Sequence, residues 1–267
     1  FSRSPKNIFG ATPPTLLGPN TAEPNPTHAV LGKAYMSIMD RRLAQWAYAE
    51  GLRHRAQAGF MQGLSTNHHQ FIMRHLVTRY STRDASGGKG LYVCQIDFSK
   101  AFDKVPLDLL WERLSERGVH GEMLGTLVEC YREVYLQPKV GNKVGSPFAC
   151  EQGVKQGDPA SPGLFGFYIE ILADFIDAMD AKGLPITCPT TGVLYQPCLA
   201  DTPFLDGVHG PDRTVNLLFA DDVNLLGLSA RRMNYLLALL ADFCAATGME
   251  VNVKKCELMV FHHDAAL

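Results

Sequence analysis

Residues 215–228 read VNLLFADDVNLLGL, in which two apolar arms flank the acidic pair Asp221 and Asp222. Each arm is short and rich in leucine and valine, as buried strands are. The stretch therefore predicts a β-hairpin that carries two carboxylates at its tip. Neighbouring carboxylates repel each other, and apolar surroundings withhold the water that would screen them. A divalent cation bound by oxygen ligands would compensate this repulsion, whereas a solvated turn, in which aspartate is common, is the alternative.

An acidic residue also ends a second apolar run. LYVCQIDF at 91–98 follows a loop-like stretch rich in Ser and Gly, and we interpret it as a buried strand with Asp97 near its end. A carboxylate on a strand adjacent to the hairpin would complete a shared site for Mg²⁺, whose preferred ligands are hard oxygens. We therefore expect Asp97, Asp221 and Asp222 to meet in space.

The rest of the chain is predicted to be mainly helical. Apolar residues at helical spacing predict helices at 36–50, 66–80, 107–117, 124–131, 163–182 and 230–247. Strand-like patterns predict a hairpin at 138–152, with Gly141 and Asn142 at its turn, and short strands at 249–253 and 257–262. Residues 184–213, rich in Pro, Thr, Gly and Asp, are interpreted as an inserted loop, and residues 1–27 as irregular.

Composition argues against several classes of protein. With 267 residues, 46% of them hydrophobic, the chain can bury the core of one large domain or two small ones and is not a disordered tail. It lacks an apolar run of about 18 residues, which argues against a membrane-spanning protein. Seven cysteines, an odd number without a CxxC pair, argue against a disulfide framework and favour a reducing compartment. The chain begins at Phe1 without a signal-like segment, so we interpret it as a piece of a longer protein.

The net charge of −2 hides a gradient along the chain. Residues 1–90 carry 11 Lys and Arg against 4 Asp and Glu, a net charge of +7, whereas residues 91–180 carry −6 and residues 181–267 carry −3. A basic first third beside an acidic remainder would hold phosphates at one end and cations at the other. Ordinary variation of the surface charge is the alternative interpretation.

Four stretches of the chain resemble, in order, the motifs of reverse transcriptases. They are QIDFSKAFDKV (95–105), GVKQGDPASPGLFGFYIE (153–170), NLLFADDVNLL (216–226) and GMEVNVKKCELMVF (248–261). The variant is similar to that of non-LTR (LINE-type) retrotransposons. Their polymerase core has this FADD box and an upstream box with QAGF and ST, which here is QAGFMQGLST (57–66). The resemblance covers roughly residues 32–262.

The resemblance implies an α+β fold, the fingers and palm of a right-hand polymerase. We expect an antiparallel palm sheet that carries Asp97 and the 215–228 hairpin, with helices 107–117 and 163–182 packed on one face. In this division residues 1–31 are an irregular lead-in, 32–90 part of the fingers, and 91–267 the palm, with a finger-like hairpin near 138–152. A thumb and an endonuclease are expected to lie outside the chain.

The resemblance also implies the activity, RNA-directed DNA synthesis, in which a primer 3′-hydroxyl attacks the α-phosphorus of a dNTP with the help of two Mg²⁺ ions, or Mn²⁺ in their place. It implies that Asp97 and Asp221 bridge the ions and that Asp222 is an auxiliary acid, whose alternative role is that of a turn residue. The expected partners are an RNA template, a DNA primer, dNTPs and the remaining domains of a retroelement polyprotein, with no membrane. The expected location is intracellular, in the nucleus or the cytoplasm.

Two aromatic residues after Asp97 are implied to contact the nucleotide. By resemblance, the backbone of Phe98 lies along the triphosphate and the ring of Phe102 lies against the sugar. A bulky ring there would exclude a 2′-hydroxyl, the group that separates ribonucleotides from deoxyribonucleotides, and would favour dNTPs. A plain core phenylalanine is the alternative for Phe102.

Two further motifs supply implied contacts. Gln156 and Gly157 match the family's QG pair, in which glycine lets the backbone approach closely and glutamine lies near the nucleotide and the template. From the bare sequence, Gly157-Asp158-Pro159 is only a turn. Lys255 matches a lysine that protonates or steadies pyrophosphate, where negative charge develops. Its neighbour Lys254 is a rival, and an exposed lysine without a role is the alternative.

The chain departs from the family in the upstream box. Met61 and Leu64 stand where the family usually has arginines, whose forked guanidinium binds phosphate oxygens. Nucleotide affinity would fall unless Arg53, Arg55 or Arg74 substitutes. A decayed or domesticated domain that binds nucleic acid without catalysis is therefore the second hypothesis. A third, a phosphoryl-accepting domain with an acidic pair, would need parallel strands with a helix after each, which the hairpin opposes.

Overall fold

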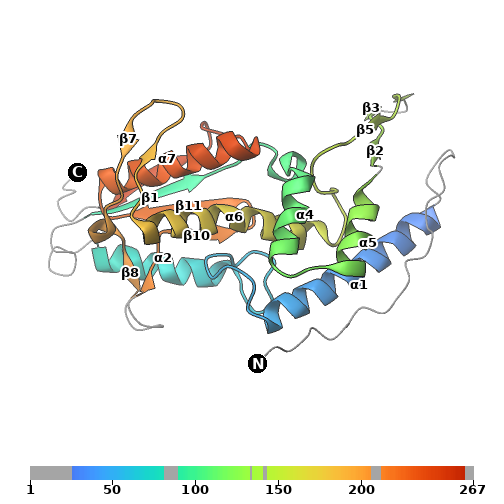
Figure 1. Ribbon diagram of the computed structural model, residues 1–267, viewed down its shortest axis with the longest axis horizontal. Coiled ribbons are helices and arrows are strands. Elements are labelled where there is room, and N and C mark those ends of the chain that lie inside the picture. The colour runs from blue at the N-terminus through green and yellow to red at the C-terminus, as the bar shows by residue number, and fades with distance from the viewer. Residues whose placement is uncertain (1–25, 81–89, 133, 141–142, 206–211, 262–267) are drawn as a thin grey trace.

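A four-stranded antiparallel sheet forms the centre of the molecule (Figure 1). The computed structural model describes residues 26–80, 90–132, 134–140, 143–205 and 212–261. The sheet has the order β10-β11-β1-β12, and its strands are β1 (Leu91–Ile96), β10 (Asn216–Phe219), β11 (Asp222–Gly227) and β12 (Glu257–Phe261). β10 and β11 form the hairpin predicted at 215–228, and β1 lies within the predicted strand 91–98.

Alternation along β1 separates two hydrophobic cores. Leu91 and Val93 pack with α2 (Thr66–Tyr80) in one core, while Cys94 and Ile96 join a larger core on the other face of the sheet. Because the side-chain period of a strand is two, a slip of one residue would exchange the two sets and expose apolar side chains on both faces. The hydrophobic pattern therefore fixes the register of β1 against its neighbours.

The larger core includes the buried sides of two long helices, α6 (Ser161–Lys182) and α7 (Ala230–Thr247). α7 packs against β1 and β11, whereas α4 (Leu107–Glu116) packs against α6. Figure 1 shows α2 and α7 on opposite sides of the strands. α7 therefore covers the sheet directly, and α4 and α6 belong to the same core, so the packing of 107–117 and 163–182 on one face stays a prediction.

Further helices and short strand pairs complete the described part. The helical segments are α1 (Pro26–Ala49), α5 (Gly121–Arg132) and the 3₁₀ turns η1 (Ala101–Lys104) and η2 (Leu199–Asp201). The short strands pair as β2 (Tyr135–Leu136) with β5 (Phe148–Ala149), β3 (Lys139–Val140) with β4 (Lys143–Val144), β6 (Ile186–Thr187) with β7 (Leu194–Tyr195), and β8 (Phe204–Leu205) with β9 (Asp212–Arg213).

Several sequence-based boundaries differ from the structure. α1 begins at Pro26 and not at Met36, because proline fits the first turn of a helix, so residues 26–31 are not part of an irregular lead-in. The stretch 184–213 is more than a loop, since it contains the β6–β7 and β8–β9 pairs. Val251 makes an isolated bridge in place of a strand at 249–253.

The hairpin predicted near 138–152 is present as the β3–β4 and β2–β5 pairs. Its predicted turn at Gly141 and Asn142 lies outside the described residues, as do residues 1–25 of the expected lead-in.

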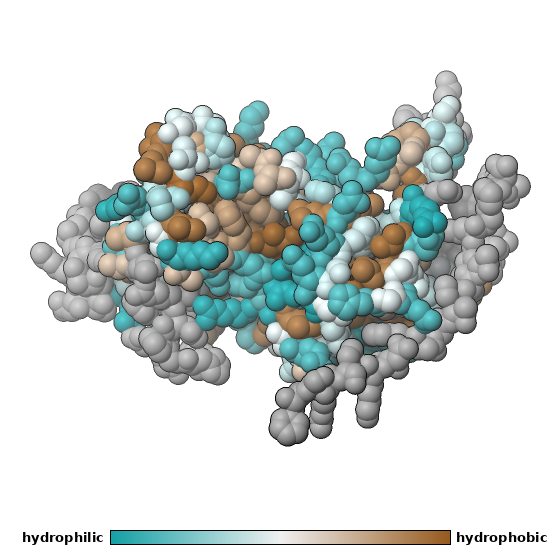
Figure 2. All heavy atoms as spheres, viewed as in Figure 1, coloured by the Kyte–Doolittle hydropathy of each residue, from teal (hydrophilic) through white to brown (hydrophobic). Residues whose placement is uncertain are grey.

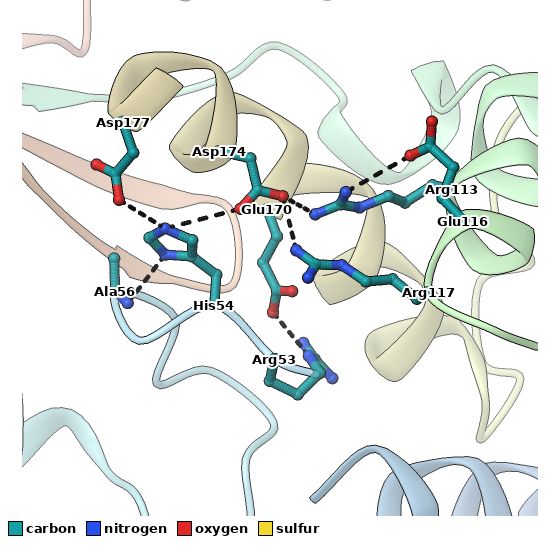
Figure 3. Close-up of polar contacts among 9 residues, drawn as sticks. All are labelled: Arg53, His54, Ala56, Arg113, Glu116, Arg117, Glu170, Asp174 and Asp177. Atoms are coloured by element: carbon teal, nitrogen blue, oxygen red, sulfur yellow. Dashed lines mark hydrogen bonds and ion pairs between the residues drawn. The ribbon is translucent and has the colours of Figure 1, made fainter. Parts of the chain in front are cut away.

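Charged residues tie α6 to two other parts of the chain (Figure 3). Asp174 accepts hydrogen bonds from Arg113 of α4 and from Arg117, the latter at 2.7 Å. His54 Nε2 lies 3.2 Å from Asp177 Oδ2. These contacts fasten both α4 and the segment after α1 to α6.

The same segment after α1 forms a buried ion pair with α6. Arg53 Nε donates to Glu170 Oε1 at 2.7 Å, and the two side chains are 6% and 0% exposed. The Arg53 guanidinium also lies 4.3 Å from the centre of the Phe167 ring. Burial of two charges costs desolvation free energy, which the attraction offsets only while both partners are present. Arg53 was one of the candidate phosphate ligands, but its guanidinium is buried in this ion pair and stabilises the fold.

None of the helices in the described segments is both long and apolar enough to cross a lipid bilayer. The face shown in Figure 2 mixes hydrophilic side chains with smaller hydrophobic patches. Large apolar residues that are exposed lie on several elements, among them Tyr48, Phe71, Tyr135 and Leu258. Single exposed apolar residues of this kind are normal on a protein surface.

We predict that Glu170→Gln lowers the free energy of unfolding by about 3 kcal/mol, because the buried Arg53 guanidinium loses its counter-charge. Urea unfolding of the full chain measures the change. The control is Glu129→Gln, which removes the exposed partner of Arg132 in an ion pair of 2.5 Å. An exposed pair contributes only about 0.5 kcal/mol. If the two variants lose the same free energy of unfolding, the buried pair stabilises the fold no more than an exposed pair does.

Candidate active site

A cavity of about 510 Å³ opens where β1 ends and where the β10–β11 hairpin turns. Six of the eight predicted site residues line it, namely Asp97, Phe98, Phe102, Gln156, Asp221 and Lys255. The other two, Asp222 and Gly157, are not among its lining residues. The fold thus brings four separate sequence motifs to one cavity.

Backbone contacts fix Asp97 at the end of β1. Its N–H donates to Cys256 Sγ at 3.4 Å, and its carbonyl oxygen accepts from the N–H of Asn252 at 2.8 Å. The next residue, Phe98, bridges to Val251. The segment before β12 therefore holds the main chain of Asp97, while its carboxylate remains available to the cavity.

Asp221 lies in the two-residue loop between β10 and β11. The ladder of the hairpin closes with Phe219 opposite Asp222, which leaves Ala220 and Asp221 as the loop. Ala220 has a φ of 58°, a value that is unfavourable for a residue with a Cβ atom. The tip of the hairpin is therefore a tight and strained turn, which needs support from neighbouring segments.

The register of the sheet brings the third acid to the same place. Ile96 pairs with Val223, so the next residues along the two strands, Asp97 and Asp222, lie opposite each other. Partial burial and the negative charges of Asp221 and Asp97 raise the pKa of the Asp222 carboxyl above its ordinary value. The three acids thus form one cluster of negative charge at the end of the sheet.

One ammonium group faces this cluster. Lys255 Nζ lies 3.8 Å from Asp97 Oδ2, and its side chain is 69% exposed. A turn positions it, since its N–H donates to the carbonyl oxygen of Asn252 at 2.9 Å. Its rival Lys254 is not among the residues that line the cavity. The structure therefore favours Lys255 as the lysine of this site.

The carboxylates provide a partial set of metal ligands. Among the residues that the structure describes, no three Asp, Glu, His or Cys side chains are grouped closely enough to hold an ion by themselves. Mg²⁺ is usually bound by one or two carboxylates together with water and substrate phosphates, so a complete protein cage is not required. Asp97 and Asp221, which line one cavity, fit this chemistry. A site shared by all three acids stays a prediction.

Phe102 belongs to both the cavity and the core. Its ring stacks on Phe165 of α6, with 4.4 Å between the ring centres and 14° between the ring planes. It is half-buried and also lines the cavity. Phe102 is therefore both a core residue and a cavity residue, two roles that the sequence presents as alternatives. Phe165 holds its ring at the cavity wall.

Gln156 reaches the cavity, but Gly157 does not. Gln156 Nε2 donates to Asp103 Oδ1 at 2.8 Å, which joins the 153–170 motif to the segment after Asp97. Gly157 has a φ of 80°, and no atom lies within 4 Å of the place where a Cβ would be. Its positive φ favours glycine in this structure, while the close approach to a nucleotide that the resemblance implies stays a prediction.

Four polar residues line the cavity that the sequence did not single out, namely Ser99, Lys100, Asp103 and Asn252. The first three lie within six residues of Asp97, and this proximity was an available signal. Lys100 also has an unusual positive φ of 52°, just before η1. The same signal was available for Asn252, which lies three residues before Lys255 in the 248–261 stretch.

The arginines expected to replace the missing phosphate ligands are not at the cavity. Neither Arg53, which pairs with Glu170, nor Arg55 and Arg74 are among its lining residues. Positive charge at the cavity comes instead from Lys100 and Lys255.

A histidine of α2 packs against the β10–β11 hairpin. The rings of His69 and Phe219 meet edge to face, with centres 6.2 Å apart and planes at 79°. Burial lowers the pKa of His69 below its ordinary value, and the neighbouring His68 acts in the same direction, while a hydrogen bond with the backbone of Ala56 acts against them. The ring is therefore neutral at neutral pH.

Sequence comparison gives relatives of the chain. The model of the reverse transcriptase (RNA-dependent DNA polymerase) family matches residues 24–265. The "Retrovirus-related Pol polyprotein from type-1 retrotransposable element R2" of Popillia japonica is 26% identical over 226 residues, which are 84% of this chain and 28% of that protein. A protein of the same name from Nasonia vitripennis is 26% identical over 171 residues, 64% of this chain and 14% of that protein. The chain thus spans less than a third of these relatives.

Solved structures of telomerase share the fold. Apo telomerase from Candida Tropicalis, truncated from its C-terminal domain, matches with a TM-score of 0.54 and 12% identity, over 86% of this chain and 40% of that chain. Telomerase from Candida albicans in complex with a TWJ fragment of telomeric RNA matches with a TM-score of 0.53 and 12% identity, over 86% of this chain and 34% of that chain. At such low identity the likeness concerns the fold alone.

We predict that acidification weakens the fold through His69. Because its pKa is lower in the folded than in the unfolded chain, protonation favours unfolding. The stability is complete above the ordinary histidine pKa of about 6.5 and falls as the pH drops below it. Urea unfolding between pH 7 and pH 5 should show a smaller loss for His69→Gln than for the unchanged chain. His75→Gln, at an exposed position of the same helix, is the control and should keep the original pH dependence.

Proposed function

Because the chain belongs to the reverse transcriptase (RNA-dependent DNA polymerase) family, we propose that it extends a DNA primer with dNTPs on an RNA template. The observation that carries this proposal is the meeting of Asp97, Asp221 and Lys255 in one cavity. The volume of about 510 Å³ lies in the range of pockets that hold small molecules of nucleotide size.

Asp97 and Asp221 would hold Mg²⁺, with Asp222 as an auxiliary acid. Bound Mg²⁺ would supply the neutralisation of charge on the phosphate oxygens and the activation of the attacking hydroxyl. The fold positions the two carboxylates, because Asp97 is fixed at the end of β1 and Asp221 at the tip of the hairpin. The raised pKa of Asp222 supports the proposal, because a cation relieves repulsion among carboxylates.

Lys255 is the proposed proton donor to the leaving pyrophosphate. Its ammonium lies 3.8 Å from Asp97, and its exposed side chain can turn toward a bound phosphate. Lys100, on the wall of the same cavity, adds a second positive charge. Together they supply part of the phosphate binding that the family usually obtains from arginines.

Phe102 and Gln156 are the proposed selectors of the nucleotide. The Phe102 ring, held by Phe165, lies at the wall of the cavity and would collide with a 2′-hydroxyl of the sugar. Gln156 donates a hydrogen bond to Asp103, the residue after Phe102, and would contact the nucleotide or the template. The backbone of Phe98 would lie along the triphosphate, while Gly157 gives the 153–170 motif its turn.

The proposed partners follow from the relatives. A telomerase with a similar fold was solved with a fragment of telomeric RNA, which supports an RNA strand as the partner of this chain. Since the R2 relatives are Pol polyproteins of which the chain spans less than a third, we place it within a larger polyprotein. In this proposal residues 32–90 belong to the fingers and residues 91–267 to the palm.

A decayed domain that binds nucleic acid without catalysis is the second candidate. It is favoured by the missing arginines at Met61 and Leu64 and by the loss of Arg53 to the ion pair with Glu170. Calorimetric titration of the full-length protein with dNTP, with and without Mg²⁺, separates the two candidates. Metal-dependent binding of dNTP supports the polymerase, and its absence supports the decayed domain.

We predict that Asp221→Asn lowers dNTP incorporation on a primed RNA template by about 10³-fold, because a neutral amide is a poor ligand for Mg²⁺. Single-nucleotide extension measures the rate. Asp108→Asn, at an exposed position in the first turn of α4, is the matched control and should keep the rate of the unchanged chain. Undiminished synthesis by Asp221→Asn would reject the catalytic role.

We further predict that Phe102→Ala weakens the preference for dNTPs over ribonucleotides by about 10²-fold, because the ring no longer blocks the 2′-hydroxyl. Extension rates with dATP and with ATP give the preference. Phe102→Tyr retains the ring and should retain the preference. If Phe102→Ala discriminates as well as Phe102→Tyr, the ring is only a part of the core.

A further inference from the structure

The tip of the β10–β11 hairpin has a backbone donor that the hairpin itself does not satisfy. Ala220, the first loop residue, has a φ of 58°, whereas Asp221 has no positive φ. This combination is typical of a type II′ turn, in which the first loop residue is usually glycine. Alanine adopts the conformation only under strain, so an outside contact is needed to hold the turn.

Gln57 makes that contact. Its side-chain Oε1 accepts a hydrogen bond from the N–H of Ala220 at 3.1 Å and another from the N–H of Gly59 at 2.7 Å. The residue is 1% exposed, so water does not compete for these donors. A neutral amide next to the acidic pair adds no further negative charge, which a carboxylate at the same position would do.

The main chain around Gln57 is attached to the same hairpin. The N–H of Ala58 donates to the carbonyl oxygen of Leu218 at 2.8 Å, and the N–H of Leu218 donates to the carbonyl oxygen of Ala56 at 2.8 Å. Gln57 and Leu218 thus form a parallel bridge beside β10. The segment 56–59 therefore acts as a short additional strand that ends at the turn.

Gly59 allows this segment to approach the turn. A Cβ atom on Gly59 would lie 2.2 Å from the backbone nitrogen of Ala220, a distance that no side chain can occupy. The close approach of two backbones is the reason for glycine here, because it brings Gln57 Oε1 within reach of the Ala220 N–H.

We propose that Gln57 is a positioning residue, which sets the place of the Asp221 carboxylate by fixing the preceding peptide of the turn. The proposal rests on the function proposed above. The hydrogen-bonded Ala220 directly precedes Asp221, and the repulsion among the three acids tends to push the turn away from Asp97. The upstream QAGF stretch thus contributes to metal binding without supplying a ligand.

The test compares Gln57→Leu with Gln62→Leu in the full chain. Gln62 lies five positions after Gln57 and is exposed, so its variant controls for the change from amide to alkyl. Three quantities are measured: the hydrogen-exchange rate of the Ala220 N–H, the binding of Mn²⁺ by electron paramagnetic resonance, and kcat and KM for dNTP. The Mn²⁺ binding that Asp221→Asn abolishes defines the site.

We expect Gln57→Leu to exchange the Ala220 N–H at least about tenfold faster and to bind Mn²⁺ about tenfold more weakly. The kcat should fall by about 10²-fold with little change in KM, because the carboxylate is misplaced and not the nucleotide. Gln62→Leu should match the unchanged chain in all three measurements. If Gln57→Leu does not fold, Gln57→Asn replaces it, since the shorter side chain keeps the amide but does not reach Ala220.

A merely structural role gives a different result. Faster exchange at Ala220 with unchanged Mn²⁺ binding and kcat would overturn the proposal, as would unchanged exchange. If the unchanged chain makes no DNA, the proposed function fails, whereas the positioning role is still decided by exchange and Mn²⁺ binding. Adding Ala220→Gly to Gln57→Leu should partly restore the slow exchange at position 220 and the Mn²⁺ binding, because glycine adopts the positive φ without strain.

Discussion

Antiparallel pairing of β1 with β11 is the constraint on which the candidate site depends. The pair Ile96 and Val223 is the last in the ladder, and the register that it sets leaves Asp97 opposite Asp222. That register is fixed by burial on both faces of β1, because a slip of one residue would expose both cores. The position of the acids is therefore a consequence of hydrophobic packing along the strands that lead to them.

The acids at the end of the sheet are held by backbone contacts more than by counter-charges. The main chain of Asp97 is bound by the segment before β12, and the turn before Asp221 is bound by Gln57. In the described part of the chain, Lys255 is the residue that forms an ion pair with Asp97, while Lys100 lines the same cavity. This arrangement keeps the carboxylates in place while it leaves their charge largely uncompensated, which is the condition under which a cation binds well.

The α6 helix connects the site to the rest of the molecule. Near its start Phe165 holds the ring of Phe102 at the cavity, and further along Glu170 and Asp174 bind the segment after α1 and the helix α4. The segment after α1 continues into the QAGF stretch, whose Gln57 contacts the β10–β11 turn. Helix α6 therefore supports Phe102 directly and this turn indirectly. Arg53 serves this structure, which explains why it does not replace the arginines missing from the upstream box.

The sequence by itself determined the antiparallel hairpin, the acids Asp97 and Asp221 and most helices, because periodicity and local motifs are properties of neighbouring residues. Resemblance to the family's motifs added Phe98, Phe102, Gln156 and Lys255, which the fold brings to the same cavity. Tertiary structure alone decided that α7 packs against β1 and β11, that Lys255 and not Lys254 faces Asp97, and that Gln57 holds the hairpin. Such choices depend on which segments pack together. Contacts between residues more than a hundred positions apart have no local signature, since their free energy arises only when packing brings them into reach.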